Sequence, residues 1–443
     1  MEDAGHSREK RPGEPMSATR SKITSISMEH FKGFERARVS LGDFTVLVGT
    51  NASGKSNVGD ALRFLHGIGR ANCSLDEIAF GSWGTSVAPD WEGIRGGAND
   101  LAYFGTDTFA VEVGFSPGES HGGLTYRIEV RRTAPGRLAL ASERLVDVKS
   151  GDFVFDSHPP DDPHEQPSDP QFVTVRFGRH REPIVPEFQT FRRDTPVLSQ
   201  LAWRETRLGT RCPPEHVSAM SALYRVRFPD LRPTVMRRPS PVGRHSLADN
   251  VAGLSSVLQN ICETKGRKSD LLDWLSDLAP IEITDIEFIL DPSGRIHLYL
   301  VDVNGHKTSA ESISDGTLRV LALLAMFFGR DSENLYFIDE LETGIHPTRQ
   351  HLLVQIIESR VREGATQVIA TTHSPQLLAF LSPESVENAV VAYRYDDETT
   401  QHLCKLCSIP SAREVLDNHH LAELHGTGWL EDAISCSRET DES

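Results

Sequence analysis

Residues 46–57 read VLVGTNASGKSN, and this stretch decides the fold. It holds the pattern G-x-x-x-x-G-K-S, whose fixed positions are Gly49, Gly54, Lys55 and Ser56. An apolar run typical of a strand precedes the pattern, and a segment with helical spacing follows it. The two glycines let the backbone curl so that its N–H groups point at phosphate oxygens. We therefore predict a phosphate-binding loop between a strand and a helix.

The loop residues predict ATP and Mg²⁺ as the cofactors. In this pattern Lys55 supplies a cation to the β- and γ-phosphates, and the Ser56 hydroxyl completes the Mg²⁺ shell. The dipole at the start of the following helix adds to the attraction for phosphate. We expect the other loop contacts to the nucleotide to come from Asn51, Ser53 and Asn57.

The strand expected over residues 335–338 ends in two acidic residues. The sequence there reads LYFIDE, so Asp339 and Glu340 follow four apolar residues. Asp339 would hold Mg²⁺ through water, and Glu340 would polarise the water that attacks the phosphate. Many strands end in acidic residues, but this pair together with a phosphate loop predicts a metal–nucleotide site.

A further strand is expected to place a histidine at the same metal–nucleotide site. Residues 367–375 read QVIATTHSP, which places His373 at the carboxyl end of a strand, where open α/β sheets bind their ligands. A lone histidine is more often structural. The chain order of phosphate loop, acidic pair and strand-end histidine favours a catalytic role here.

A second helix start also suits phosphate. Residues 312–317 read SISDGT, directly before an apolar helix expected over 318–328, and they include Ser314, Asp315 and Gly316. Such a start can bind a γ-phosphate, and the alternative is an ordinary N-cap. Since the nucleotide already has its own loop, we expect this helix start to serve the nucleotide of another subunit.

These pieces together resemble the ABC-type ATPase heads of the SMC, RecF and OLD superfamily, above all the stand-alone predicted ATPases of bacteria and their defence systems. The resemblance rests on four stretches: MEHFKGFERARVSLGDFTVLVGTNASGKSNVGDALRFL, SDGTLRVLALLAMFF, LYFIDELETGIHP and VIATTHSPQLL. It implies an α/β P-loop NTPase, an ABC-ATPase-like head with a mixed central sheet, an antiparallel β-lobe and a helical insertion. Because the insert is rich in proline and has no heptad run, we expect no long coiled coil.

The resemblance also implies roles for the first hairpin and for a glutamine. Phe31, Lys32 and Phe34 fall where the family's hairpin approaches the base and phosphates of the nucleotide. The Q-loop glutamine of the family falls on Gln200 or, as the alternative, on Gln189. An ordinary surface glutamine is the other interpretation of each.

Three further motifs take their roles from the resemblance. The residues SDG at 314–316 match the signature motif that closes on the ATP of the partner protomer. His373 matches the switch histidine. Residues 344–346 occupy the D-loop, with His346 where transporter ATPases usually have aspartate.

Composition divides the chain into four expected parts. Residues 1–20 read as a polar, disordered tail without a signal-peptide core. Residues 21–150 form an N-terminal ATPase lobe, 151–280 an arginine-rich loop and helical insertion, and 281–443 a C-terminal ATPase lobe. Only 70 residues follow the switch histidine. We therefore expect any nuclease to be a separate chain.

The charge is unevenly distributed. The formal net charge of −17 argues against a wholly basic nucleic-acid coat protein. Residues 171–245, however, hold 14 arginines, no lysine and six acidic residues, which gives this segment a net charge of +8. Two interpretations stay open: a surface for DNA or an acidic partner, and pairing within the molecule to its acidic body.

Composition also predicts where the protein works. The longest apolar run, Val320–Phe328, has nine residues, whereas a membrane-spanning helix needs about 20, so we expect no membrane contact. Six scattered cysteines do not make a disulfide framework, which predicts a reducing, cytoplasmic setting.

The predicted function is that of an ATP-hydrolysing molecular switch, with Lys55, Glu340 and His373 as its catalytic residues. It would dimerise head to tail around two ATP–Mg²⁺ and signal to a separate DNA-acting partner such as a nuclease, in bacterial anti-phage defence or DNA repair. The alternative is an ATP-binding assembly scaffold with negligible turnover that organises an effector protein. The intact Glu340 favours turnover.

Overall fold

The computed structural model describes most of the chain, and the expected tail over residues 1–20 lies outside the described part. The described residues are 21–70, 72–81, 92–116, 123–157, 167–178, 188–210, 212–245, 247, 249–264, 266–279, 282–329, 333–364, 366–395, 397–409, 412–416, 421–427, 429 and 433.

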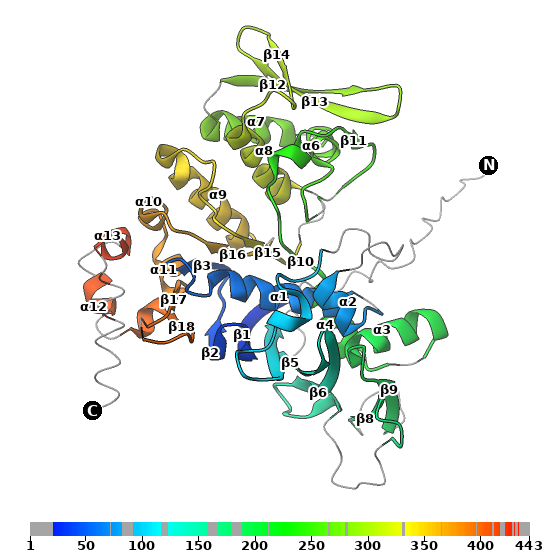
Figure 1. Cartoon of the computed structure of the whole chain (residues 1–443). Coiled ribbons are helices and arrows are strands. Elements are labelled where there is room, and N and C mark those ends of the chain that lie inside the picture. The colour runs from blue at the N-terminus through cyan, green and yellow to red at the C-terminus, as the bar shows by residue number, and fades with distance from the viewer. Residues whose placement is uncertain are drawn as a thin grey trace, which may run out of the picture.

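Three β-sheets organise these residues (Figure 1). The largest is antiparallel, with strand order β2-β1-β4-β5-β6-β7-β8-β9. Its strands are β1 Lys22–Phe31, β2 Phe34–Ser40, β4 Thr108–Ser116, β5 Leu124–Ala134, β6 Arg137–Asp147, β7 Phe153–Asp156, β8 Phe172–Phe177 and β9 Phe188–Arg192. This sheet confirms the predicted antiparallel β-lobe. It continues well past residue 150, into the part that we expected to be an arginine-rich loop.

The central sheet is mixed, as predicted, with strand order β10-β15-β16-β3-β17-β18. Its strands are β3 Phe44–Val48, β10 Val226–Arg227, β15 Leu335–Ile338, β16 Gln367–Thr371, β17 Val390–Tyr393 and β18 His402–Lys405. The pairs from β10 to β17 are parallel, and β18 pairs antiparallel with β17 at the edge. Every residue of β3, β15 and β16 is buried, as expected for parallel strands covered on both faces.

The third sheet belongs to a lobe at the top of Figure 1, where it lies beside helices. Its strands are β11 Ser240–Pro241, β12 Ile283–Leu290, β13 Arg295–Asp302 and β14 Lys307–Ser309, and the helices are α6 Leu254–Cys262, α7 Arg267–Leu278 and α8 Asp315–Phe328. The backbone N–H of Gly294 donates to the carbonyl of Asp291 and closes the hairpin turn between β12 and β13.

The remaining helices surround the two larger sheets. They are α1 Lys55–Gly69, α2 Leu75–Phe80, α3 Val197–Leu208, α4 Glu215–Tyr224, α5 Pro233–Met236, α9 Gln350–Arg362, α10 Pro375–Leu378, α11 Pro383–Glu387, α12 Ala412–Leu416 and α13 Leu421–Gly426. The longest helix of the described residues, α1, has 15 residues, so this part of the chain has no coiled-coil arm. Within it, no helix combines the length and apolar character that crossing a membrane requires.

Strand β3 separates two hydrophobic cores. The side chain of Leu47 packs into the core shared by the antiparallel sheet and α1, whereas Val46 and Val48 pack into the core shared with α8 and α9. This division follows because successive side chains of a strand point to opposite faces of the sheet. The end of β3, from which the next residues continue, is therefore packed against a hydrophobic core on each face of the sheet.

Candidate functional site

The register of the central sheet brings three predicted motifs to one edge. In the parallel pairs, Leu47 of β3 lies opposite Thr371 of β16, and Ile338 of β15 lies opposite Ala370. The carboxyl ends of β3, β15 and β16 therefore lie side by side. Ligands of open α/β sheets bind at this edge.

The phosphate loop follows β3 and depends on two glycines. Gly49 and Gly54 have φ angles of 150° and 105°, which side chains rarely permit. A Cβ atom at Gly49 would also lie 2.0 Å from the carbonyl oxygen of Ala392. Gly54 then begins α1 as its N-cap. The two glycines of the motif thus lie at the positions where the loop backbone needs a positive φ.

Lys55 reaches back over the loop that it follows. Its Nζ donates to the carbonyl oxygens of Gly49 and Thr50, at 2.7 Å each. Burial lowers the pKa of Lys55 to about 8, although the carboxylates of Asp339 and Glu340 oppose this shift. The ammonium group is therefore held inside the loop, close to two negative groups.

Ser53 carries an unsatisfied group within the same loop. Ser53 is 1% exposed, and its Oγ has no hydrogen-bond partner among the residues that the structure describes. A Cβ atom at Gly49 would lie 2.9 Å from this oxygen. Buried polar atoms are nearly always paired. A phosphate oxygen in the loop would satisfy this hydroxyl, so the loop fits a nucleotide.

The Ser56 hydroxyl and the Asp339 carboxylate face each other across the site. Ser56 Oγ lies 3.5 Å from Asp339 Oδ2, and Asp339 Oδ1 accepts a hydrogen bond of 2.5 Å from Thr371 Oγ1. Among the described residues, no three His, Cys, Asp or Glu side chains gather as a metal site. Mg²⁺ bound with a nucleotide takes only one or two protein carboxylates, and water and phosphates complete its shell. Ser56 and Asp339 therefore fit Mg²⁺.

Glu340 has an unusual backbone conformation. Its φ is 48°, in the left-handed region that a non-glycine residue rarely adopts. Its backbone N–H donates to Thr371 Oγ1 at 2.8 Å, and its Oε2 accepts from Thr343 Oγ1 at 3.1 Å. One hydroxyl, that of Thr371, therefore fixes both Asp339 and Glu340.

These residues line one open cavity of about 240 Å³. It is lined by Asn51, Ala52, Ser53, Gly54, Lys55, Ser56, Asn57, Arg95, Asp339, Glu340, His373 and Gln401. His373 is held at this wall because its backbone N–H donates to Glu342 Oε1 at 2.8 Å. The structure therefore brings together the predicted loop, acidic pair and histidine.

Two residues of this wall, Arg95 and Gln401, were not predicted as site residues. The Arg95 guanidinium is paired with Asp60 at 2.7 Å, and its Nη2 donates to Asn57 Oδ1 at 3.4 Å. Neither residue belongs to a recognisable motif, so no local pattern identifies them as site residues. They reach the site from a loop before β4 and from the connection between β17 and β18.

The signature residues lie apart from this cavity. Ser314 caps α8 by accepting a hydrogen bond from the backbone N–H of Thr317, at 3.2 Å. Arg237 donates to the carbonyl of Ile313 and, at 2.6 Å, to Asp315 Oδ1. Ser314, Asp315 and Gly316 are absent from the residues that line the cavity of their own chain.

The signature and D-loop nevertheless touch each other. A Cβ atom at Gly316 would lie 2.5 Å from the carbonyl oxygen of Gly344. Only a residue without a side chain allows this approach. The two motifs are thus packed into one continuous surface.

The first hairpin does not reach the nucleotide cavity in the way we expected. The Lys32 side chain is 9% exposed, and its Nζ lies 2.8 Å from both the carbonyl oxygen of Arg95 and Asp60 Oδ2. Phe31 and Phe34 are fully buried. The Phe34 ring lies 2.8 Å from the Cβ position of Gly54, so it supports the phosphate loop from the core side. Lys32 is engaged in an internal ion pair, and the hairpin side chains act as core residues.

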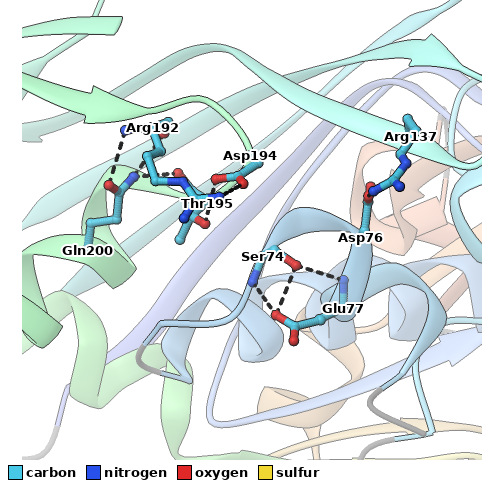
Figure 2. A network of polar contacts seen from close by, with 8 residues as sticks. All are labelled: Ser74, Asp76, Glu77, Arg137, Arg192, Asp194, Thr195 and Gln200. Atoms are coloured by element: carbon cyan, nitrogen blue, oxygen red, sulfur yellow. Dashed lines mark hydrogen bonds and ion pairs between the residues drawn. The ribbon is translucent and has the colours of Figure 1, made fainter. Parts of the chain in front are cut away.

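Gln200 also lies elsewhere, near the start of α3 (Figure 2). Its Nε2 donates to the carbonyls of Arg192 and Thr195, and its Oε1 accepts from the backbone N–H of Arg192. Both ends of the amide are therefore used in joining β9 to α3. The alternative, Gln189, accepts a hydrogen bond from Arg204. Neither glutamine lines the cavity, where the only glutamine among the lining residues is Gln401.

Most described arginines of residues 171–245 are bound within the molecule. Ion pairs join Arg192 to Asp194, Arg225 and Arg227 to Glu333, Arg232 to Glu92 and Asp230, and Arg237 to Asp315. Arg176 and Arg204 lie over aromatic rings, and Arg193 donates to two carbonyls. These contacts support the interpretation of internal pairing. Arg179, Arg181 and Arg211 lie outside the described residues.

Sequence and structure comparisons agree on this architecture. A model of the family described as "AAA domain, putative AbiEii toxin, Type IV TA system" matches residues 44–147 and 164–379. Among solved structures, the Smc head domain with an extended coiled coil from Pyrococcus furiosus, bound to the C-terminal domain of ScpA, superposes with a TM-score of 0.50. The match has 14% identity and covers 90% of this chain and 99% of that one. At this identity it shows the fold alone.

Two curated relatives match shorter stretches. Endonuclease MutS2 of Clostridium acetobutylicum is 30% identical over 106 residues, 24% of this chain and 13% of that protein. Endonuclease MutS2 of Lactococcus lactis subsp. lactis is 25% identical over 157 residues, 34% of this chain and 20% of that protein. The chain thus spans no more than a fifth of the length of these two relatives.

The family model covers well over half of the chain. The parallel strands β3, β10, β15 and β16, the phosphate loop and the acidic strand end all lie in the matched region. The chain therefore belongs to the P-loop ATPase family described as "AAA domain, putative AbiEii toxin, Type IV TA system", and its fold is that of an SMC-type ATPase head.

Proposed function

We propose that this protein is an ATP-driven switch that hydrolyses ATP and signals to a separate partner. The observation that carries this proposal is the meeting of five side chains around one cavity. They are Lys55, Ser56, Asp339, Glu340 and His373. They come from three separate stretches of sequence and contain a cation, a pair of Mg²⁺ ligands and a carboxylate suited to act as a base.

Each side chain has a distinct role in this proposal. Lys55 neutralises the β- and γ-phosphates, and Ser56 and Asp339 hold Mg²⁺, which when bound neutralises charge on the phosphates. Glu340 accepts a proton from the attacking water. His373, which also lines the cavity, orients the terminal phosphate.

We further propose that two protomers share their ATP sites. The SDG motif at 314–316 lies outside the cavity of its own chain, yet packs against the D-loop at Gly344. A head-to-tail two-fold dimer would bring this surface onto the nucleotide of the partner. ATP binding would close such a dimer, and hydrolysis would open it.

The output of the switch is proposed to be a signal to a DNA-acting protein, in anti-phage defence or DNA repair. The MutS2 relatives are named as endonucleases, and the Smc head was solved with bound ScpA. Both names support a partner-directed role. Direct DNA contact through residues 171–245 would fall to exposed arginines with no described ion pair, such as Arg207, Arg238 and Arg244.

A turnover assay tests the enzymatic core of the proposal. Wild-type protein should release phosphate from ATP in the presence of Mg²⁺. Glu340→Gln should retain ATP binding but hydrolyse ATP roughly 100-fold more slowly or worse, because the amide has no basicity. ATP binding with no turnover in the wild-type protein would instead favour the assembly scaffold. Gln355→Ala, on the exposed face of α9, provides the matched control.

A further inference from the structure

Gln401 lies in the connection between β17 and β18 and is anchored on two sides. Its backbone N–H donates to the carbonyl of Gly33 in the first hairpin, at 2.8 Å. The neighbouring Thr400 hydroxyl lies 2.7 Å from the Tyr103 hydroxyl. Two segments that are distant in sequence, the first hairpin and the loop before β4, therefore hold Gln401 in place beside the cavity.

Both ends of the Gln401 amide are bonded to the phosphate loop. Its Nε2 donates to the carbonyl of Ala52 at 2.9 Å, and its Oε1 accepts from Asn57 Nδ2 at 2.7 Å. Ala52 has a φ of 63°, which a non-glycine residue adopts only at a free-energy cost. The hydrogen bond to its carbonyl helps to hold this unfavourable conformation.

The contacts continue across the rim of the cavity. The Asn57 amide also accepts a hydrogen bond from Arg95, at 3.4 Å, and Arg95 is paired with Asp60. A line of polar contacts therefore runs from Gln401 through Asn57 to Arg95. Each of these three residues lines the cavity.

Two glycines leave the space that the amide fills. A Cβ atom at Gly33 would lie 2.2 Å from Gln401 Oε1, and one at Gly54 would lie 2.6 Å from the same oxygen. Gly33 does not have a positive φ, so its backbone alone does not require glycine. A side chain at residue 33 would instead collide with the Gln401 amide.

We propose that Gln401 is a positioning residue of the ATP site, one that holds the phosphate loop in the shape that binds phosphate. None of its described bonds involves Asp339, Glu340 or His373. It should therefore set the affinity for nucleotide and leave the hydrolysis step nearly unchanged. This inference rests on the proposed binding of ATP by this cavity.

The test compares the affinity for Mg²⁺–ATP with the rate of turnover. Two lost hydrogen bonds of about 0.5–1 kcal/mol each correspond to roughly a fivefold to thirtyfold weaker affinity. Gln401→Ala should raise the Kd and KM for ATP by this factor, with kcat within about twofold of wild type. Gln355→Ala, the same substitution at an exposed site, should change neither quantity.

A second variant displaces the amide without removing it. Gly33→Ala should push the Gln401 side chain away from the loop and raise the Kd by a similar factor. In the double variant, the two effects should not add, because both break the same contacts. Thermal unfolding of each variant shows whether it is folded. If Gln401→Ala does not fold, the affinity of Gly33→Ala for ATP still tests the inference.

The outcomes separate this inference from the proposed function. If Lys55→Ala abolishes ATP binding while Gln401→Ala and Gly33→Ala leave the Kd unchanged, the ATP site stands and the inference is wrong. Tighter binding by Gln401→Ala also overturns it, because the amide would then obstruct the site. If Lys55→Ala binds ATP as the wild type does, the proposed function itself fails.

Discussion

The Ser56 hydroxyl and the Asp339 carboxylate lie 3.5 Å apart, although 283 positions separate them along the chain. The parallel register of β15, β16 and β3 produces this meeting, because it aligns the carboxyl ends of all three strands. Thr371, at the end of the intervening strand, bonds to Asp339 and to the backbone of Glu340. The geometry of this edge is therefore a consequence of strand order.

Thr371→Val should uncouple the two acidic residues. The substitution keeps the shape of the strand but removes the hydroxyl that donates to Asp339 and accepts from Glu340. We expect a fall in kcat of roughly tenfold, from the loss of about 1–2 kcal/mol of hydrogen bonding, and a higher Mg²⁺ requirement. Thr371→Ser, which retains the hydroxyl, should behave as the wild type. Equal turnover by the Val and Ser variants would show that this hydroxyl does not position the pair.

Lys55 predicts a pH dependence of nucleotide affinity. Burial lowers its pKa to about 8, and only the protonated ammonium attracts phosphate. Bound phosphates favour this charged form, so affinity is full below the pKa and falls as the pH rises through it. Above pH 8, the Kd for ATP should increase by up to about tenfold for each pH unit.

Lys55→Arg supplies the comparison for this pH series. Arginine stays protonated throughout the range, so the variant should show a flat affinity between pH 7 and 9.5, at constant free Mg²⁺. If the Kd for ATP changes with pH in the same way in the wild type and in Lys55→Arg, a group other than Lys55 causes the pH dependence.

Glu143 predicts a pH dependence of stability. Its buried carboxylate accepts hydrogen bonds from the backbone of Val197 and Leu198 and from the Tyr126 hydroxyl. Burial raises its pKa from 4.5 to about 7. The folded state therefore binds the proton more tightly than the unfolded state. This contribution to stability is complete below about pH 4.5 and is lost as the pH rises through 7.

Chemical denaturation at pH 5.5 and 8.5 measures the effect. The free energy of unfolding of the wild type should fall over this interval by an amount on the order of 2 kcal/mol. Glu143→Gln, which cannot ionise, should reduce this fall. An identical fall in both proteins would place the responsible group elsewhere.

Arg237 should act on the signature motif and not on DNA. Its guanidinium bonds to the carbonyls of Glu311 and Ile313 and to Asp315, at the start of α8. Arg237→Ala should lower ATP turnover several-fold, because a hydrogen bond to a charged group contributes about 1.5–3 kcal/mol. Arg238→Ala, at an exposed neighbour, should leave turnover unchanged. The opposite pattern would contradict a structural role for Arg237.

Local sequence was sufficient where strands are buried and motifs are contiguous. The strand at 335–338 occurs with the predicted bounds, and a strand at 367–371 leads to His373 as predicted, because short apolar runs in a parallel sheet form buried strands. Local patterns are less informative at the start of α6, where Val251 and Gly253 adopt positive φ angles and the helix begins directly after them, at Leu254.

Sequence patterns could not predict which side chains from distant segments contact each other. The position of Lys32 on the hairpin could be predicted, but its ion pair with Asp60 depends on how the hairpin packs against α1. The family resemblance indicated Gln200 as the Q-loop glutamine, but the hydrogen bonds of its amide link β9 to α3. Gln401 and Arg95 enter the cavity wall through packing between distant segments, and no local pattern marks them.

The central claim, that two protomers share each ATP site, predicts complementation between two inactive variants. Ser314→Arg damages the signature motif but keeps Lys55 and Glu340 intact. Lys55→Ala damages the phosphate loop but keeps the signature motif intact. In a mixed dimer, one shared site would receive both defects and the other would receive neither.

The most direct measurement is therefore ATP hydrolysis by an equimolar mixture of Ser314→Arg and Lys55→Ala proteins. Our account predicts that the mixture regains activity, up to about half of the wild-type rate for each mixed dimer, together with a second site that binds ATP. If subunit exchange is demonstrated and neither hydrolysis nor that binding site returns, the two protomers do not share their ATP sites.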